Sequence, residues 1–323
     1  MSTRIALIGA GGVAQRHAQV LSGLPGVDVV AVADPLPEAA RVLADACGAR
    51  ACAETDEALD VGVGVDAAYV CVPPFAHGPA ETAVLERGLP LFVEKPVALD
   101  LDTAERLAEL VEQAGVVTAT GYHWRHLDVV ERAQQLLTEA PALLASGYWL
   151  DKRPPVAWWG RRERSGGQVV EQLTHVLDLA RLLLGEAVEV YAAPVRDGAA
   201  DGDVDDATAA TVRFAGGAVA TFVATSVLTS KHRAALHTVS RGLRLEISET
   251  ALVVDDGSSP VEHAAATDPK VAVDADFIAA VRGERAATRT PYAEAVRSHR
   301  LACAVSDSAL TGRPVQVGAG SLA

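Results

Sequence analysis

The sequence predicts an α/β protein with an N-terminal doubly wound parallel sheet and a C-terminal α+β domain that carries a large, mostly antiparallel open sheet. Up to about residue 121, short apolar runs alternate with helical patterns, as they do in βαβ units. After residue 121, strand-like runs follow one another with turns rather than helices between them, which favours antiparallel pairing. We therefore expect domains over residues 1–121 and 122–323, with the last helices able to pack back on the first domain.

In the first domain, the expected strands are the apolar runs at 5–8, 29–33, 67–72, 89–93 and 116–120. Helical patterns cover residues 80–86 and 103–113 between these runs. Asp102 is expected to cap the second of these helices and Gly115 to end it. This alternation predicts the parallel sheet.

In the second domain, helical patterns cover residues 129–138 and 168–184, and later ones lie near 274–282 and 292–311. Expected strands at 208–214 and 218–225 flank Gly216 and Gly217, which predict a hairpin. Further strand-like runs lie at 236–239, 243–247 and 252–254. Strands joined in this way predict the antiparallel sheet.

Composition excludes several classes of protein. Half of the 323 residues are hydrophobic, so the chain is globular, and a net charge of −14 argues against nucleic acid or an anionic membrane as a partner. No apolar run reaches the ~18 residues of a transmembrane helix. The first strand begins at once, which leaves no room for a signal peptide.

The four cysteines show no zinc spacing, and the acidic loop at 196–206 lacks the glycine and glutamate of a calcium loop, so we expect no metal and a reduced cytoplasm.

A glycine-rich turn between the first apolar run and the first helical pattern predicts a dinucleotide site. Its cofactor-binding residues are Gly9, Gly11, Gly12, Val13 and Ala14. Gly9 permits a tight turn, Gly11 lets the backbone approach a pyrophosphate, and Ala14 is small enough for helix and strand to pack. The pyrophosphate would lie on the helix N-terminus. A tight turn without a ligand is the alternative.

Asp34 follows the second apolar run, 20 residues after Ala14, at the spacing of an acid that holds a ribose. Its carboxylate can accept hydrogen bonds from both ribose hydroxyls but would repel a 2′-phosphate. Pro35 and Leu36 come next, so no adjacent basic side chain is offered to such a phosphate. NAD is therefore favoured over NADP.

A polar stripe marks the helical pattern at 168–184. Glu171, His175, Asp178 and Arg181 recur at steps of four, three and three, which places them on one helix face among apolar residues. His175 suits proton transfer near neutral pH, and a carboxylate one turn earlier can orient it. A stripe that satisfies itself by ion pairs is an equal alternative.

Glu94-Lys95-Pro96 ends the expected strand at 89–93. Ligands of doubly wound sheets bind at the carboxyl ends of strands, so Lys95 could hydrogen-bond a substrate oxygen and stabilise developing negative charge there. A surface lysine at a strand end is the alternative reading.

Taken together, the glycine-rich turn, Glu94-Lys95-Pro96, and Gly166-Gly167 followed by Glu171, His175 and Asp178 resemble the Gfo/Idh/MocA oxidoreductases, which include glucose–fructose oxidoreductase and inositol dehydrogenases. The resemblance runs nearly end to end and includes the segments at 73–77 and 312–315. It implies a Rossmann domain for residues 1–121 and a substrate-binding and oligomerisation domain for 122–323.

The resemblance also implies roles for single residues. Lys95 matches the catalytic lysine and His175 the general acid/base histidine of the family, while Glu171 takes the place of an aspartate. Glu94 and Lys95 are placed beside the cofactor.

Other residues that the resemblance places near the nicotinamide are Pro73, His77 and His123. His123 stands where an asparagine is commoner and is equally a candidate core residue. Trp158 and Trp159 are candidates for stacking on a sugar ring, with packing as an equal alternative.

The resulting hypothesis is an NAD-dependent oxidoreductase that moves a hydride between the nicotinamide and a secondary alcohol or ketone of a sugar, cyclitol or sugar derivative. Lys95 and His175 would handle the substrate oxygen and its proton. The alternatives are an enzyme that retains NAD and modifies a sugar through transient oxidation, and a non-catalytic nucleotide-binding sensor. We expect a homodimer or homotetramer, because the family commonly assembles in these forms.

Overall fold

The computed structural model describes residues 2–60, 62, 64–198 and 201–318. The chain divides into two compact units. Unit 1 comprises Met1–Tyr122 and Lys270–Val296, and unit 2 comprises His123–Pro269 and Arg297–Ala323. Among the described residues, no helix is long and apolar enough to cross a membrane.

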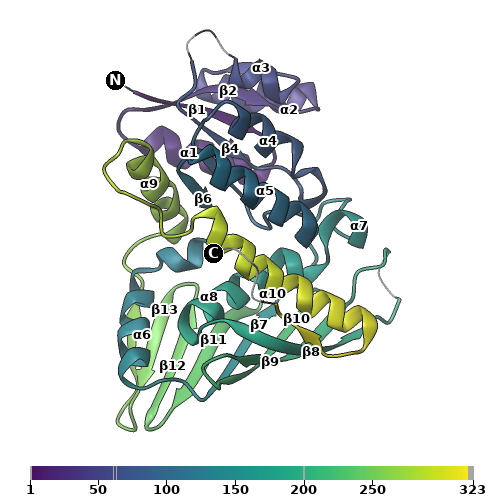
Figure 1. The fold of residues 1–323 in the computed structure, drawn as a ribbon, viewed down its shortest axis with the longest axis vertical. Coiled ribbons are helices and arrows are strands. Elements are labelled where there is room, and N and C mark those ends of the chain that lie inside the picture. Colours follow the sequence, from purple (N-terminus) through teal and green to yellow (C-terminus); the bar gives the residue numbers. More distant parts are fainter. Residues whose placement is uncertain (1, 61, 63, 199–200, 319–323) are drawn as a thin grey trace. The chain divides into compact units, whose positions relative to one another are not determined.

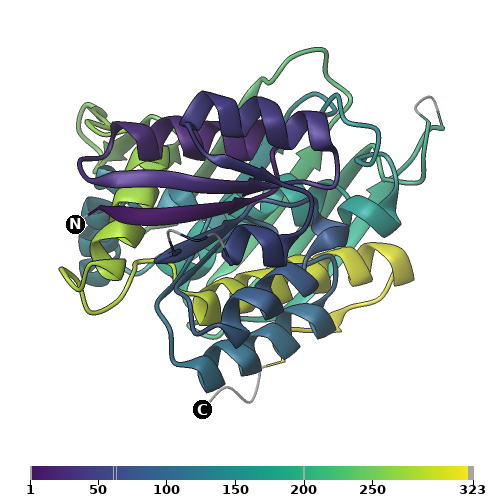
Figure 2. The same cartoon turned by 90° about the horizontal axis from the view of Figure 1, so that it is seen from above.

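Unit 1 is built on a parallel sheet with the strand order β3-β2-β1-β4-β5-β6 (Figures 1 and 2). The strands are β1 (Thr3–Ile8), β2 (Val27–Ala33), β3 (Arg50–Cys52), β4 (Ala67–Val70), β5 (Leu91–Val93) and β6 (Thr118–Thr120). This order reverses direction at β1, so the crevice for a ligand opens beside the carboxyl ends of β1 and β4. The expected doubly wound sheet is confirmed.

Helices lie on both faces of this sheet, as Figure 2 shows. They are α1 (Gly12–Gly23), α2 (Pro37–Cys47), α3 (Thr55–Leu59), α4 (Pro79–Glu86), α5 (Leu101–Ala114) and α9 (Pro269–Val281), with the short turn η1 (Pro74–Ala76). One core joins α1, α2 and α9 to the sheet, and in it Phe277 of α9 packs edge-on against the stacked rings of Tyr69 and Phe92. The segment of α9 therefore belongs to the core of unit 1.

Two details of unit 1 differ from the sequence prediction. Asp100, not Asp102, caps α5, because its side chain accepts a hydrogen bond from the backbone N–H of Thr103 at 2.8 Å. Gly115 ends the helix in the left-handed conformation, as expected. The edge strand β3 was not expected, since its three residues form no apolar run.

Unit 2 is built on a sheet with the order β14-β13-β12-β11-β7-β10-β9-β8-β15, in which every pairing but that of β7 with β10 is antiparallel. The strands are β7 (Leu144–Leu150), β8 (Ala187–Val195), β9 (Ala207–Phe214), β10 (Val219–Thr225), β11 (Arg233–Ser240), β12 (Leu243–Ser248), β13 (Ala251–Asp255), β14 (Val261–Ala264) and β15 (Val315–Gln316). The expected mostly antiparallel sheet and its β9–β10 hairpin are confirmed.

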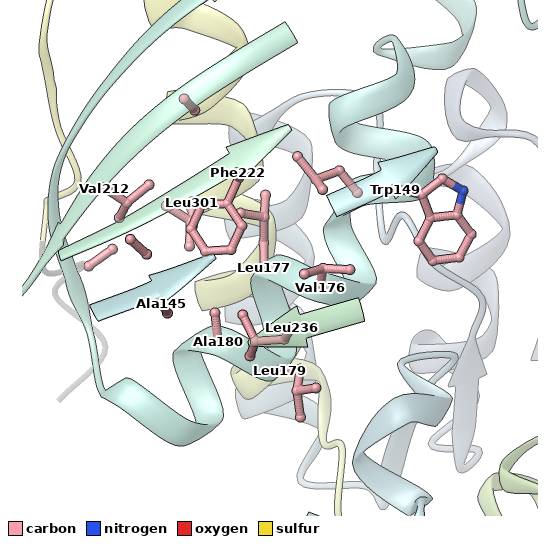
Figure 3. Packing of buried hydrophobic residues seen from close by; sticks show 14 of the residues in the cluster. Ala145, Trp149, Val176, Leu177, Leu179, Ala180, Val212, Phe222, Leu236 and Leu301 are labelled. Carbon is pink, nitrogen blue, oxygen red and sulfur yellow. The ribbon is translucent and has the colours of Figure 1, made fainter. Parts of the chain in front are cut away.

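The helices of unit 2 pack on one face of its sheet. They are η2 (His123–His126), α6 (Asp128–Glu139), α7 (Arg162–Ser165), the π-helical turn η3 (Val169–Leu173), α8 (Thr174–Leu184) and the later part of α10 (Tyr292–Thr311). Figure 3 shows Val176, Leu177 and Ala180 of α8 in the same cluster as Phe222 of β10. The expected single helix over 168–184 is thus a π-helical turn followed by an α-helix, so Glu171 and His175 are not spaced as on one regular α-helix.

The opposite face of this sheet carries exposed apolar side chains. Buried and exposed residues alternate along β9 and β10, as expected for strands with one covered face. The exposed members include Leu144, Tyr191, Val219, Val223 and Val239.

Candidate functional site

The glycine-rich turn joins β1 to α1 in unit 1. Gly9 has a φ of +99°, and a Cβ atom there would collide with the carbonyl oxygen of Cys71. Gly11 is the N-cap of α1 with ordinary extended geometry, and a Cβ on Gly11 or Gly12 would meet open space. Ala14 is fully buried. The turn therefore needs glycine at Gly9 for the fold, whereas the space in front of α1 at Gly11 is open to a ligand.

This difference predicts opposite effects for two matched substitutions. Gly9→Ala is expected to lower the free energy of unfolding by about 2 kcal/mol or more, because it combines a strained backbone with a clash against backbone. Gly11→Ala is expected to leave stability within about 0.5 kcal/mol of the parent while weakening binding of NAD⁺. Chemical denaturation and calorimetric titration with NAD⁺ measure the two effects. A destabilised Gly11→Ala with normal NAD⁺ affinity would contradict the assignment of this turn.

Asp34 lies directly after β2, beside the turn. Its Oδ2 accepts the backbone N–H of Ala10 at 2.8 Å and its Oδ1 accepts that of Leu36 at 2.9 Å. A carboxylate offers about four acceptor positions, so the side chain is oriented by the protein and can still receive two hydroxyl groups. Asp34 is half-buried, and its geometry fits the ribose of a dinucleotide.

Pro73 and His77 flank η1, the segment that follows β4. The Nδ1 atom of His77 lies 2.6 Å from Oε1 of Glu81, and both side chains are buried. The second carboxylate oxygen of Glu81 accepts the backbone N–H of Gly78 at 2.7 Å. His77 thus fixes the start of α4, and its Nε2 atom finds no hydrogen-bond partner among the described residues.

Lys95 lies just beyond the carboxyl end of β5, where a doubly wound sheet binds its ligand. The neighbouring Glu94 is buried and accepts the backbone N–H of Lys95 on Oε2 at 2.9 Å. Its Oε1 lies 2.9 Å from Nε2 of His17 and 3.0 Å from Nη2 of Arg16, both on α1. The carboxylate of Glu94 is thus engaged within the protein on both of its oxygens.

His17 is 1% exposed and contacts a second carboxylate through its other ring nitrogen. Nδ1 lies 2.7 Å and 2.9 Å from the two oxygens of Asp274 on α9, which is itself fully buried. Burial acts to lower the pKa of His17, but the charges and hydrogen bonds of Asp274 and Glu94 outweigh it and raise the pKa to about 9. Burial acts to raise the pKa of Glu94, but the hydrogen bond and charge of His17, with Arg16 and Lys95, lower it to about 2. Burial raises the pKa of Asp274.

These pKa values predict that the free energy of unfolding decreases as the pH becomes alkaline. The pKa of His17 is about 9 when folded and about 6.5 when exposed, so its contribution is complete below pH 6.5 and disappears as the pH rises through 9. The difference corresponds to about 3 kcal/mol. Burial keeps the pKa values of the neighbouring Tyr69 and Cys71 well above their usual range, so neither group titrates in the folded protein in this interval.

Urea denaturation of the wild type and of His17→Gln at pH 6.5 to 9.5 measures this contribution. The wild type is expected to lose about 3 kcal/mol more than the variant over this range. Parallel curves for the two proteins would show that His17 is not charged in the folded state.

In unit 2, His175 lies in the first turn of α8 and is 3% exposed. Its ring stacks against those of Trp149 and Trp124, with centroids 5.6 Å and 6.5 Å away, and it meets the ring of His123 edge-on at 4.6 Å. The structure therefore brings His123 and His175 together. Packing against several aromatic rings holds an imidazole in one orientation, as a proton-transferring group requires.

Asp178 and Arg181 of the polar stripe have structural partners. Asp178 forms a two-pronged ion pair with Arg125 at 2.7 and 2.8 Å and accepts the hydroxyl of Ser298 at 2.5 Å. Arg181 contacts Ser298 at 3.0 Å and Glu186 at 2.7 Å. For these two residues the alternative interpretation of the polar stripe holds, because ion pairs and hydrogen bonds within the protein satisfy both side chains. Asp178 also connects α8 to η2 through Arg125 and to α10 through Ser298.

Glu171 contacts one of the two tryptophans that were candidates for sugar binding. Oε2 of Glu171 accepts the indole N–H of Trp159 at 3.2 Å. Trp159 is 1% exposed and carries the guanidinium of Arg153 over its ring at 5.7 Å, so it packs rather than offering a face to a sugar. Trp158 is half-buried and keeps that possibility.

The sequence reasoning did not identify His17, Asp274 or Arg125. Asp274 lies 257 residues from His17, and no spacing rule links residues so far apart. For His17 and Asp274, the sequence offered one signal, namely an ionisable residue within a helical pattern that carries apolar residues, at 13–21 and 271–280.

The parallel sheet, the open glycine-rich turn and the oriented Asp34 define a protein of the dinucleotide-binding class with a second, α+β unit. The comparison with protein families gives the particular family. Residues 3–122 match the model described as "Oxidoreductase family, NAD-binding Rossmann fold", and residues 142–250 match the "GFO/IDH/MocA C-terminal domain". The chain belongs to the Gfo/Idh/MocA family of oxidoreductases, and its N-terminal part is the NAD-binding Rossmann domain of that family.

Curated relatives match part of the chain. Inositol 2-dehydrogenase of Rhizobium meliloti is 30% identical over 190 residues, 58% of this chain and 56% of that protein. The scyllo-inositol 2-dehydrogenase (NAD(+)) of Bacillus subtilis is 28% identical over 190 residues, 57% of this chain and 55% of that protein. The 2,7-anhydro-N-acetylneuraminate hydratase of Mediterraneibacter gnavus is 26% identical over 220 residues, 65% of this chain and 58% of that protein. The matches thus span little more than half the length of these relatives.

Solved structures match the whole fold. A levoglucosan dehydrogenase in complex with NADH and levoglucosan has a TM-score of 0.88 at 19% identity and covers 98% of this chain and 100% of that one. GenD2 from gentamicin A biosynthesis, in complex with NAD, has a TM-score of 0.86 at 23% identity, covering 98% and 97%. At these identities the likeness establishes the fold.

Proposed function

We propose that the protein is an NAD-dependent dehydrogenase or reductase that acts on a secondary alcohol of a cyclitol, sugar or sugar derivative. The observation that carries this proposal is Lys95 at the carboxyl end of β5, in the sheet of a domain that matches the NAD-binding Rossmann fold of an oxidoreductase family. The two inositol dehydrogenases among the relatives favour a cyclitol as substrate.

In the proposed mechanism, the chain's own residues handle the substrate oxygen. The ammonium group of Lys95 donates a hydrogen bond to this oxygen and stabilises the negative charge that develops on it. The imidazole of His175 accepts the hydroxyl proton, and in the reverse direction it returns the proton to the ketone oxygen. Bound NAD would accept the hydride from the carbon. Glu171 is proposed to support His175 through charge, and His123 to border the substrate.

The relevant experiment offers NAD⁺ and, separately, NADP⁺ to the purified protein with myo-inositol, scyllo-inositol, aldoses and polyols, and follows absorbance at the wavelength of the reduced nicotinamide. We expect reduction of NAD⁺ with one group of substrates and a much weaker signal with NADP⁺, because Asp34 would repel the 2′-phosphate. Equal rates with NADP⁺ would contradict the role given to Asp34.

A second candidate is an enzyme that retains NAD and modifies a sugar through transient oxidation. The hydratase among the relatives favours it. It predicts NAD that copurifies with the protein and no accumulation of NADH with any substrate of the panel.

We also propose that the protein works in the cytoplasm as a homodimer or homotetramer. The apolar residues on the uncovered face of the unit 2 sheet support self-association, since isolated proteins rarely expose large apolar patches. Light scattering coupled to size-exclusion chromatography measures the mass in solution, and a mass of 33.5 kDa would contradict this proposal.

A further inference from the structure

His17 occupies an unusual place for a histidine of the first helix. Its ring is buried against Tyr69 and Phe92, with centroids 5.3 Å and 5.0 Å away, and each of its nitrogens faces a carboxylate. Deprotonated carboxylates only accept hydrogen bonds, and a neutral imidazole has a single N–H. A neutral ring would therefore turn a lone pair towards Asp274 or Glu94 at less than 3 Å. The geometry requires the imidazolium form, which donates to both sides.

The two oxygens of Glu94 divide their partners. Oε1 receives His17 and Arg16, and Oε2 receives the backbone N–H of Lys95. The carboxylate fits its place because residue 121 is a glycine: a Cβ atom there would collide with the carboxylate of Glu94. Glu94 is thus held from α1 on one side and from the end of β6 on the other.

Asp274 anchors the far end of this chain of contacts. It lies on α9, is fully buried, and comes from the segment that returns to unit 1 after strands β7 to β14 of the unit 2 sheet. The contacts therefore run from α9 through His17 to Glu94 and to the backbone of Lys95, all within unit 1.

We propose that His17, as a cation bridging Asp274 and Glu94, is a positioning residue that fixes the Lys95 segment. The proposal rests on the proposed function, in which Lys95 contacts the substrate oxygen. His17 itself has no part in the chemistry. It sets the orientation of the Glu94 carboxylate and thereby the place at which the Lys95 backbone leaves β5. A misplacement of Lys95 by about 1 Å is enough to reduce turnover by up to about 10²-fold.

The low lysine content of the chain allows a test that does not depend on turnover. The sequence contains four lysines: Lys95, Lys152, Lys231 and Lys270. Reductive methylation with ¹³C-formaldehyde keeps their charge and gives one NMR signal for each lysine and a further one for the N-terminal amine, and Lys95→Arg identifies the signal of Lys95. Spectra of the full chain are recorded for the wild type, His17→Gln and Asp274→Asn. His299→Gln is the matched control, because His299 is also fully buried but lies on α10 in unit 2.

We expect His17→Gln and Asp274→Asn to move the Lys95 signal by more than its linewidth and to leave the signals of Lys152 and Lys231 in place. His299→Gln should move none of them. A Lys95 signal at its wild-type position in folded His17→Gln would overturn the proposal. Should His17→Gln not fold, the same reading applies to Asp274→Asn, which keeps the shape of the side chain but removes its charge.

Steady-state kinetics provide a second measurement, which a purely structural role of His17 would leave unchanged. With the substrate returned by the NAD⁺ panel, kcat of His17→Gln should fall by about tenfold or more, while the Kd for NAD⁺ stays within threefold. Unchanged kcat would overturn the positioning role and leave the proposed function intact. Conversely, if the panel returns no substrate, the NMR arm still decides the role of His17 while the proposed function fails.

Discussion

His175→Ala and Lys95→Ala are each expected to lower kcat by about 10²–10⁴-fold, the range in which positioned acid–base groups contribute. In the proposed mechanism, His175 supplies the proton acceptor and Lys95 the charge that stabilises the substrate oxygen, so each loss acts on the transition state. The affinity for NAD⁺ should stay within a few-fold, because neither side chain belongs to the glycine-rich turn or to Asp34. Steady-state kinetics and calorimetric titration with NAD⁺ measure the two quantities.

Matched controls exist for both variants. Lys270→Ala removes a lysine from the start of α9, and His299→Gln replaces a buried histidine of unit 2. Both should keep wild-type kcat within about twofold, since the proposed mechanism uses neither side chain. If His175→Ala retained more than a tenth of the wild-type kcat, proton transfer would have to be assigned to another group.

Arg125→Met is expected to lower the free energy of unfolding by about 3–5 kcal/mol, the cost of leaving one charge of a buried pair without its partner. The side chains of Arg125 and Asp178 are 6% and 1% exposed, and both guanidinium contacts are short. Without Arg125, the carboxylate of Asp178 still accepts the hydroxyl of Ser298 but has lost the opposite charge. Urea denaturation measures the loss.

An exposed pair provides the contrast. The guanidinium of Arg41 is 59% exposed and contacts Glu38 on the surface of α2, so Arg41→Met should lower the free energy of unfolding much less than Arg125→Met. The double variant Arg125→Met with Asp178→Leu should recover most of the stability lost, because no unpaired charge remains. A loss below 1 kcal/mol for Arg125→Met alone would show that water or a rearranged side chain satisfies Asp178.

The sequence was sufficient for the parts of the fold that repeat a simple pattern. The strands β1, β2, β4, β5 and β6 are apolar runs, and the structure places each of them in the parallel sheet, although several are shorter than expected. The strand β7 was not predicted, because it mixes small, polar and aromatic residues and pairs with strands far along the chain. The π-helical turn before α8 also leaves no periodic trace in so short a segment.

In the candidate site too, residues marked by a local sequence pattern could be predicted, whereas contacts between distant parts of the chain could not. Gly9, Asp34 and Lys95 could be predicted as candidates because each lies within two residues of the end of a strand whose apolar pattern is clear. Asp178 could be noticed as a buried charge, but its partner Arg125 lies 53 residues earlier, so the sequence left its role open. The contacts of His17 with Glu94 and Asp274 join three elements that only the folded sheet brings together.

The central claim is that this chain transfers a hydride from a substrate carbon to NAD⁺, with Lys95 and His175 handling the oxygen. The most direct measurement uses the substrate found with the NAD⁺ panel, labelled with deuterium at the carbon that bears the oxidised hydroxyl. Mass spectrometry of the reduced cofactor then shows where the hydrogen went. The account predicts NADH that is heavier by one deuterium, with formation slowed in Lys95→Ala and His175→Ala. Unlabelled NADH, or a labelled product formed at the wild-type rate by both variants, would contradict it.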